Sequence, residues 1–215
     1  EMAKAVAGSS QGKAKFPTLP PAKGRYETPL EVDPFRVEMQ KKLDYLMWAC
    51  QILQDHVSIK TATAMLEFFR TDKLFLSTEG SLIEQRITES GGAIEATAAL
   101  DHEVQKRSFP SSNGSCLAQA GYEHVKGMDL VGEAARVRKE AVALLRAKEC
   151  PSGPRTVILM PDQVVLQLHE SCGHPAELDR ALGQELSFAG GSFLTPDLLG
   201  KFHYGSKRVN VTADA

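Results

Sequence analysis

The sequence has no run of apolar residues that approaches the roughly 18 needed to cross a membrane as a helix. It also lacks an excess of basic charge, because 25 lysines and arginines face 27 aspartates and glutamates and leave a net charge of -2. A surface that binds phosphates usually shows a basic excess. We therefore expect neither a nucleic-acid partner nor a membrane partner.

Cysteine is scarce, and its four copies (Cys50, Cys116, Cys150 and Cys172) form no CxxC pair. Such scattered cysteines are typical of a reduced, cytoplasmic chain. The sequence begins at Glu1 rather than at a methionine, and no secretory signal pattern follows. We expect a cytoplasmic protein and interpret the chain as a piece of a longer one.

The composition is that of a globular chain, 42% hydrophobic and 24% charged. Residues 1–9 resemble the end of a helix, and the proline-rich residues 13–33 predict an extended surface connector. Asp33 and Pro34 have the form of a helix start, with Asp33 as the N-cap and proline at the first position. An apolar stripe between Phe35 and Leu53 predicts that this helix faces a sheet.

Residues 57–104 alternate β-branched and aromatic residues with polar ones, which predicts an antiparallel meander. We interpret RTDK (70–73) as a turn, the glycine pair 91–92 as punctuation, and Thr78-Glu79-Gly80 as a turn or bulge, with substrate contact as its alternative role. A helix is predicted at 132–149. The expected fold class is α+β, with an antiparallel sheet packed by helices in a unit covering residues 34–150.

Residues 151–215 predict a further unit that begins with a short buried strand at 155–160 (RTVILM). A helix then starts at Pro161-Asp162 and carries the stretch HESCGH (169–174). A glycine-rich loop, a short helix begun by Thr195-Pro196 and a final strand at 208–212 complete this unit. We expect the chain to stop before a carboxy-terminal domain.

The stretch HESCGH differs by one residue from the HExxH pattern of helical zinc hydrolases. Histidines four apart on an α-helix lie within about 40° of each other, whereas histidines five apart diverge by about 140°. A π-bulge would absorb the extra residue and bring His174 back beside His169. Gly173 relaxes the backbone and Pro175 removes an N–H, so we predict a bulge, kink or helix end between Ser171 and Glu177.

If the two histidines converge, the residue types fit a catalytic zinc. Neutral imidazole nitrogens bind Zn²⁺ readily, and such a site leaves a position for a water whose pKa falls to about 7. Glu170 then acts as the base that takes the proton of that water. The alternative is that a short H-E-H pattern arises by chance and that each histidine is an ordinary structural residue.

The wider stretch HESCGHPAELDR resembles the signature of the TldD/PmbA metalloprotease family, historically called modulators of DNA gyrase. The matching positions are His169, Glu170, Gly173, His174, Glu177 and Asp179. Similarity extends to STEGSLIEQ (77–85), FAGGSFLTPD (188–197) and VNVTAD (209–214).

This resemblance implies a cytoplasmic zinc peptidase that acts on small or unfolded peptides, as a homodimer or as a heterodimer with a related subunit. It implies that His169 and His174 bind zinc, that Glu170 is the base, and that a cysteine outside this chain is the third ligand. Relative to the family pattern, the chain covers a central region, and we expect it to be inactive alone. The rival hypothesis is a non-catalytic partner or scaffold subunit.

Four further side chains are candidates near this site. Cys172 follows His169 by three residues and is a candidate ligand or a small buried hydrophobe. Glu177 follows His174 by three residues and could bind the ion or orient an imidazole, and Asp179 could support the same site. His203 lies beyond the glycine-rich loop, and its sequence position leaves surface and substrate-pocket roles open.

Overall fold

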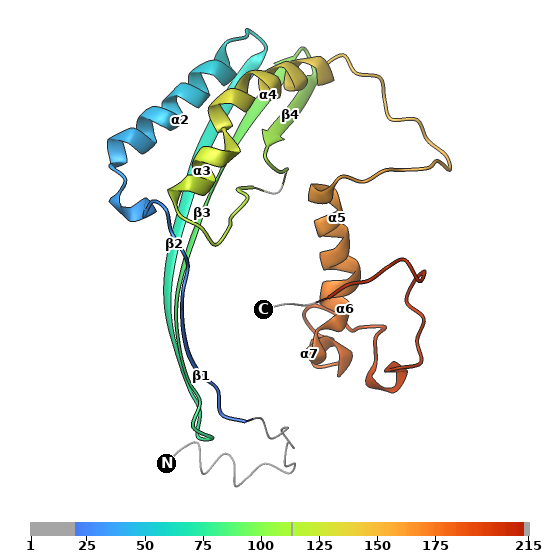
Figure 1. The fold of residues 1–215 in the computed structure, drawn as a ribbon. Coiled ribbons are helices and arrows are strands. Elements are labelled where there is room, and N and C mark those ends of the chain that lie inside the picture. The colour runs from blue at the N-terminus through green and yellow to red at the C-terminus, as the bar shows by residue number, and fades with distance from the viewer. Residues whose placement is uncertain (1–19, 113, 213–215) are drawn as a thin grey trace. The chain divides into compact units, whose positions relative to one another are not determined.

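The computed structural model describes residues 20–112 and 114–212, so the helix end expected at residues 1–9 lies outside the described residues. The chain divides into two compact units, Glu1–Lys148 and Glu149–Ala215 (Figure 1). The first unit contains β1 (Lys23–Glu27), a 3-10 turn (Pro34–Arg36), α2 (Met39–Gln54), β2 (Ile59–Leu76), β3 (Leu82–Leu100), β4 (Glu103–Phe109), α3 (Tyr122–Met128) and α4 (Leu130–Leu144). This arrangement of one sheet and packed helices is the predicted α+β fold.

The sheet is built around β3, which pairs antiparallel with β2 over nearly the whole length of both strands. β4 extends the antiparallel meander by pairing with the second half of β3. β1 was not predicted: it lies in the proline-rich connector and pairs parallel with Leu82–Arg86 of β3. Its sequence KGRYE has no apolar alternation, and all five residues are exposed. Backbone pairing with β3, rather than burial of side chains, therefore holds this strand in the sheet.

The core of the first unit lies where α2 and α4 pack together on the upper half of the sheet (Figure 1). Ile94, Ala96 and Ala98 of β3 point to this face, as the two-residue period of a strand requires. α2 and α4 contribute the remaining fully buried members, which are Ala49, Leu53, Leu130, Ala134, Val137 and Ala141. The small alanines let the two helices approach the sheet and each other closely.

The predicted helix start at Asp33 is correct only for one turn. The Asp33 carboxylate accepts a hydrogen bond from Phe35 N at 2.9 Å, as an N-cap does, but the segment is a 3-10 turn and the regular helix begins at Met39. The carbonyl of Pro34 accepts from Lys42 Nζ at 2.6 Å instead of from a helical N–H. The predicted helix at 132–149 is α4, which begins at Leu130 and ends at Leu144.

The turn predicted at 70–73 does not exist, and the glycine pair predicted as punctuation does not interrupt its strand. Residues 70–73 continue β2, where Asp72 lies opposite Arg86 of β3 and its Oδ1 lies 2.7 Å from Arg86 Nε. The pair Gly91-Gly92 also continues β3, and its role is close approach rather than punctuation. A Cβ on Gly91 would lie 2.8 Å from the Cys116 carbonyl oxygen, and one on Gly92 would lie 2.7 Å from a Leu66 methyl.

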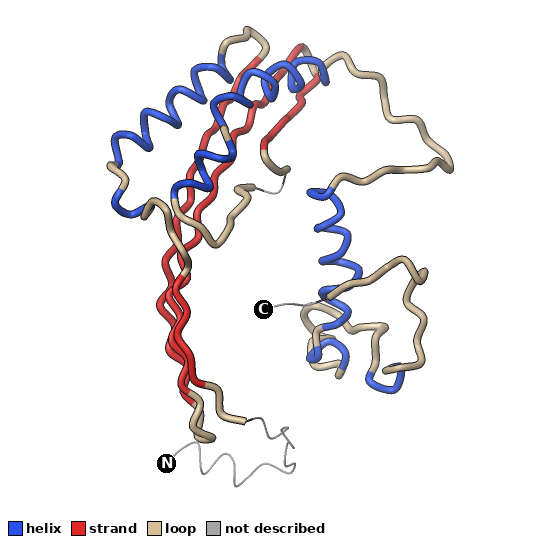
Figure 2. Tube along the Cα trace, in the orientation of Figure 1, coloured by secondary structure: helices blue, strands red, loops and turns tan. Residues whose placement is uncertain are grey.

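The turn predicted at Thr78-Glu79-Gly80 is present, and it joins β2 to β3 with Gly80 at a positive φ of 100°. Near this turn the hairpin runs on as a ribbon beyond the helices (Figure 2). Its side chains there are largely exposed, including Leu74, Phe75 and Leu76. The polar residues of 70–73 suit a part of the sheet that water reaches.

The second unit contains α5 (Pro161–Leu168), a π-helix (His169–Gly173), α6 (His174–Ala176), α7 (Leu178–Ala181) and a 3-10 turn (Pro196–Leu198). The strands predicted at 155–160 and 208–212 are wrong, because neither segment is paired within the described chain. Val157 and Ile158 are 70% and 88% exposed. Without a partner strand, the β-propensity of these residues does not produce a strand. No described helix in either unit has the length and apolar character needed to cross a membrane.

Candidate metal centre

The HESCGH stretch lies at an irregular point of its helix, as its spacing predicted. α5 begins at Pro161 and is regular to Leu168, and a π-helix then covers His169–Gly173. The N–H of His174 donates to the carbonyl of His169, five residues back, which is the hydrogen bond that absorbs the extra residue. The helical backbone ends at Glu177, which has an extended ψ of 125°.

The π-helix brings the two imidazoles together. His169 Nε2 and His174 Nε2 are 2.8 Å apart, and the ring centroids are 4.3 Å apart at 61°. Glu170 completes a cluster in which one ligand atom from each residue lies within 4.8 Å of the others. Three residues that are adjacent or nearly adjacent in sequence thus direct two nitrogens and a carboxylate at one small volume.

The donor set and its spacing fit a zinc ion. Two imidazoles and a nearby carboxylate are the groups from which protein zinc sites are built. A tetrahedral zinc with bonds of about 2.0–2.1 Å would hold two nitrogens about 3.3 Å apart, so the rings need to separate by only about half an ångström. A hydrogen bond between the two Nε2 atoms requires a proton on one of them, and a bound metal ion would take the place of that proton.

Glu177 holds one of the two imidazoles in orientation. Its Oε1 lies 2.8 Å from His174 Nδ1, and its Oε2 lies 2.5 Å from Arg180 Nε. The hydrogen bond with His174 lowers the pKa of the Glu177 carboxyl, and the charge of Arg180 acts in the same direction. An ionised carboxylate accepts the Nδ1–H of His174 and thereby leaves the Nε2 lone pair for a metal.

Replacing Glu177 by Gln is expected to weaken zinc binding about 10- to 100-fold, the range typical of losing a carboxylate that orients a ligating histidine. The amide is nearly the same size but carries no charge and polarises the imidazole less. Competition between the protein and a chromophoric chelator measures the affinity. Asp162→Asn, in the first turn of α5, is the matched control, and an unchanged affinity in Glu177→Gln would contradict this role.

The other sequence candidates lie outside the cluster. Asp179 Oδ1 accepts from the N–H of Arg180 at 2.8 Å. Cys172 Sγ lies 3.6 Å from the hydroxyl oxygen of Tyr204 and is not one of the grouped ligand atoms. His203 is exposed and, among the described residues, does not join the group either.

Two contributing residues were missed by the sequence reasoning. Arg180 could have been found, because it follows Glu177 by three residues and opposite charges at that spacing pair on a helix. Tyr204 gave no such signal. It lies 33 positions from Ser171, whose carbonyl it contacts, and only the fold brings the two together.

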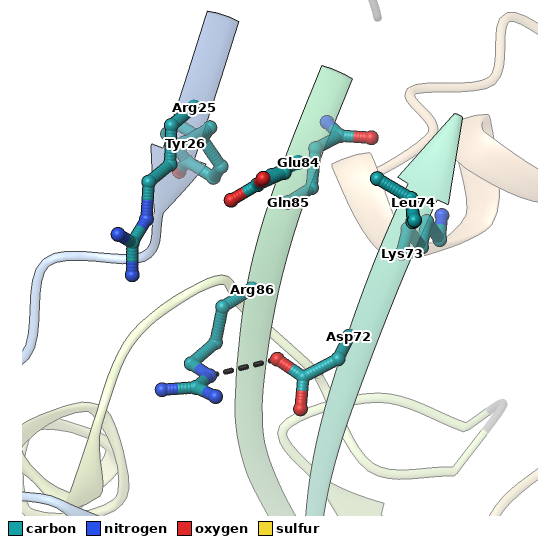
Figure 3. A pocket seen from close by; sticks show the side chains of 8 residues that line it. All are labelled: Arg25, Tyr26, Asp72, Lys73, Leu74, Glu84, Gln85 and Arg86. Carbon is teal, nitrogen blue, oxygen red and sulfur yellow. Dashed lines mark hydrogen bonds and ion pairs between the residues drawn. The ribbon is translucent and has the colours of Figure 1, made fainter. Parts of the chain in front are cut away.

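The first unit has a hollow of about 320 Å³ on the exposed ribbon, between β1, β2 and β3 (Figure 3). Two of its charged side chains, Arg86 and Asp72, are engaged with each other. Arg86 binds Asp72 and lies 3.9 Å from Glu27, and the hydrogen bond from Arg86 lowers the pKa of Asp72. We interpret this network as cross-strand stabilisation, and the candidate chemistry remains at the histidines.

Comparisons with known proteins bear on that chemistry. No protein-family model matches the chain. Over 185 residues it is 26% identical to a metalloprotease of Methanocaldococcus jannaschii, covering 86% of this chain and 38% of the relative. Over 148 residues it is 28% identical to a metalloprotease of Methanothermobacter thermautotrophicus, covering 63% of this chain and 32% of the relative.

A solved structure from Thermotoga maritima, described as a candidate modulator of a DNA gyrase, matches with a TM-score of 0.43 and 19% identity. That match covers 66% of this chain and 29% of the other. The chain thus spans well under half the length of the curated relatives that it matches. In sequence, the chain is related to archaeal proteins named metalloproteases.

Proposed function

We propose that this chain is the metal-binding part of a zinc-dependent peptidase of the TldD/PmbA type. The observation that carries the proposal is the convergence of His169 Nε2, His174 Nε2 and the Glu170 carboxylate across a π-helix. Two relatives named metalloproteases support the same class of activity. Because the chain spans 38% and 32% of those relatives, the activity is proposed for the whole protein.

In this proposal His169 and His174 hold the ion through their Nε2 atoms, and Glu177 keeps His174 in the binding tautomer. Zinc, when bound, supplies Lewis acidity and lowers the pKa of a water to about 7. The Glu170 carboxylate takes a proton from the water that adds to the peptide carbonyl carbon. It then delivers that proton to the nitrogen as the carbon–nitrogen bond breaks.

The rest of the site belongs to the proposal as well. A catalytic zinc has three protein ligands, and this chain offers two imidazoles with converging nitrogens. We propose that the third ligand comes from outside the chain and that the substrates are small or unfolded peptides. Assembly as a homodimer, or as a heterodimer with a related subunit, completes this proposal.

Elemental analysis of the whole protein tests the assignment. We expect one zinc per chain, loss of peptide hydrolysis after chelation, and recovery when zinc is returned. The double substitution His169→Ala, His174→Ala should abolish both zinc and hydrolysis. A whole protein that carries no zinc and hydrolyses no peptide would instead support the non-catalytic scaffold.

A further inference from the structure

One carbonyl of the motif helix loses its ordinary hydrogen-bond donor because of the sequence. In an α-helix the carbonyl of residue 171 accepts from the N–H of residue 175. Residue 175 is proline, which has no N–H. The Ser171 carbonyl therefore lacks its α-helical donor, and it lies inside the π-helix between the two imidazole-bearing residues.

The hydroxyl of Tyr204 provides that donor. Tyr204 Oη donates to the Ser171 carbonyl oxygen at 2.6 Å. The Tyr204 ring stacks on Phe193 with centroids 5.9 Å apart at 13°, and it meets Phe202 edge-on at 6.5 Å. These ring contacts help to orient the half-exposed phenol, in addition to its hydrogen bond.

A second contact ties the same loop to the same turn of helix. Ser192 Oγ donates to the carbonyl of Pro175 at 2.6 Å and accepts from Leu194 N at 2.9 Å. The chain from Ser192 to Tyr204 thus contacts the carbonyls of residues 171 and 175, on both sides of His174. Both contacts fall where the helix is irregular and where its own backbone offers fewer donors.

We propose that Tyr204 is a positioning residue for the metal centre: its hydroxyl completes the π-helix at Ser171 and so keeps His169 and His174 convergent. Pro175 disfavours a regular α-helix, which would turn the two histidines about 140° apart, and Tyr204 satisfies the group that the proline leaves open. The part that concerns metal rests on the proposed function. The part that concerns the helix stands without a metal.

Tyr204→Phe is the direct test, because it removes the hydroxyl and keeps the ring that packs on Phe193. We expect zinc affinity, measured by chelator competition on the whole protein, to fall about 10-fold, the lower end for losing a group that supports metal ligands. Tyr26→Phe is the matched control. Its hydroxyl donates to Gln119 in the first unit, and its loss should leave zinc affinity unchanged.

Hydrogen exchange on the metal-free protein separates this proposal from the proposed function. The amide of His174 donates to the His169 carbonyl across the π-helix, so its exchange should accelerate several-fold in Tyr204→Phe. Pro175→Ala restores an N–H that can bond Ser171. In the Pro175→Ala background, Tyr204→Phe should therefore accelerate exchange of the His174 amide less than it does in the wild-type background.

The outcomes are distinguishable. A wild-type protein that binds no zinc overturns the proposed function, and the His174 exchange rate then decides the role of Tyr204 alone. Faster exchange with unchanged zinc affinity shows that Tyr204 supports the helix without positioning the metal, which overturns the proposal. Equal exchange in wild type and Tyr204→Phe also overturns it.

Discussion

Replacing Glu170 by Gln is expected to lower kcat/KM for peptide hydrolysis by about 10²- to 10⁴-fold, the range that a positioned general base contributes. The carboxamide has the same shape but cannot take a proton from water. Zinc content should stay at one per chain, because the two imidazole nitrogens remain in place. Initial rates on an unfolded peptide, together with elemental analysis of the same sample, measure both quantities.

Glu185→Gln makes the same chemical change elsewhere in the second unit and should leave the rate and the metal unchanged. The two readouts separate the alternatives for Glu170. Loss of zinc along with activity would make Glu170 a ligand rather than the base, which its position within the 4.8 Å group makes a real alternative. Full activity in Glu170→Gln would remove the carboxylate from the mechanism.

Replacing Leu130 by Ala is expected to lower the free energy of unfolding by about 2–5 kcal/mol, as for other fully buried leucines. Leu130 has no exposed surface and belongs to the cluster that joins α4, α2 and β3. Its side chain lies over Gly92, where an added Cβ would come within 3.1 Å of Leu130 Cδ1. The neighbouring groups cannot close the cavity easily, because the strand and helix backbones surround it.

This substitution isolates packing from hydrogen bonding. The substitution leaves the backbone N–H of residue 130 in place, and this N–H donates to Tyr45 Oη at 2.9 Å. Urea unfolding followed by circular dichroism gives the free energy. Val104→Ala is the control, because Val104 is 62% exposed and should cost less than about 0.5 kcal/mol. A loss below 1 kcal/mol for Leu130→Ala would contradict the assigned core.

Local sequence chemistry predicted the features that depend on near neighbours. The five-residue spacing of His169 and His174, with Pro175 beside it, predicted an irregular helix because a regular one cannot bring the rings together. Asp33 predicted a cap, and the alternation in residues 57–104 predicted antiparallel strands. For the irregular helix and the cap, the interactions that decide the local structure lie within a few residues. Metal binding by the two histidines stays a prediction.

The tertiary structure decided what depends on distant partners. Strand propensity at 155–160 produced no strand, because no described segment pairs with it, whereas the polar residues 23–27 became β1 through hydrogen bonds to β3. Gly91 and Gly92 proved to be contact points rather than breaks, because their neighbours come from residues outside the local sequence. Tyr204 reaches Ser171 from 33 positions away. A strand, a close approach and a remote hydroxyl each require a partner, and the identity of that partner is fixed only when the chain has folded.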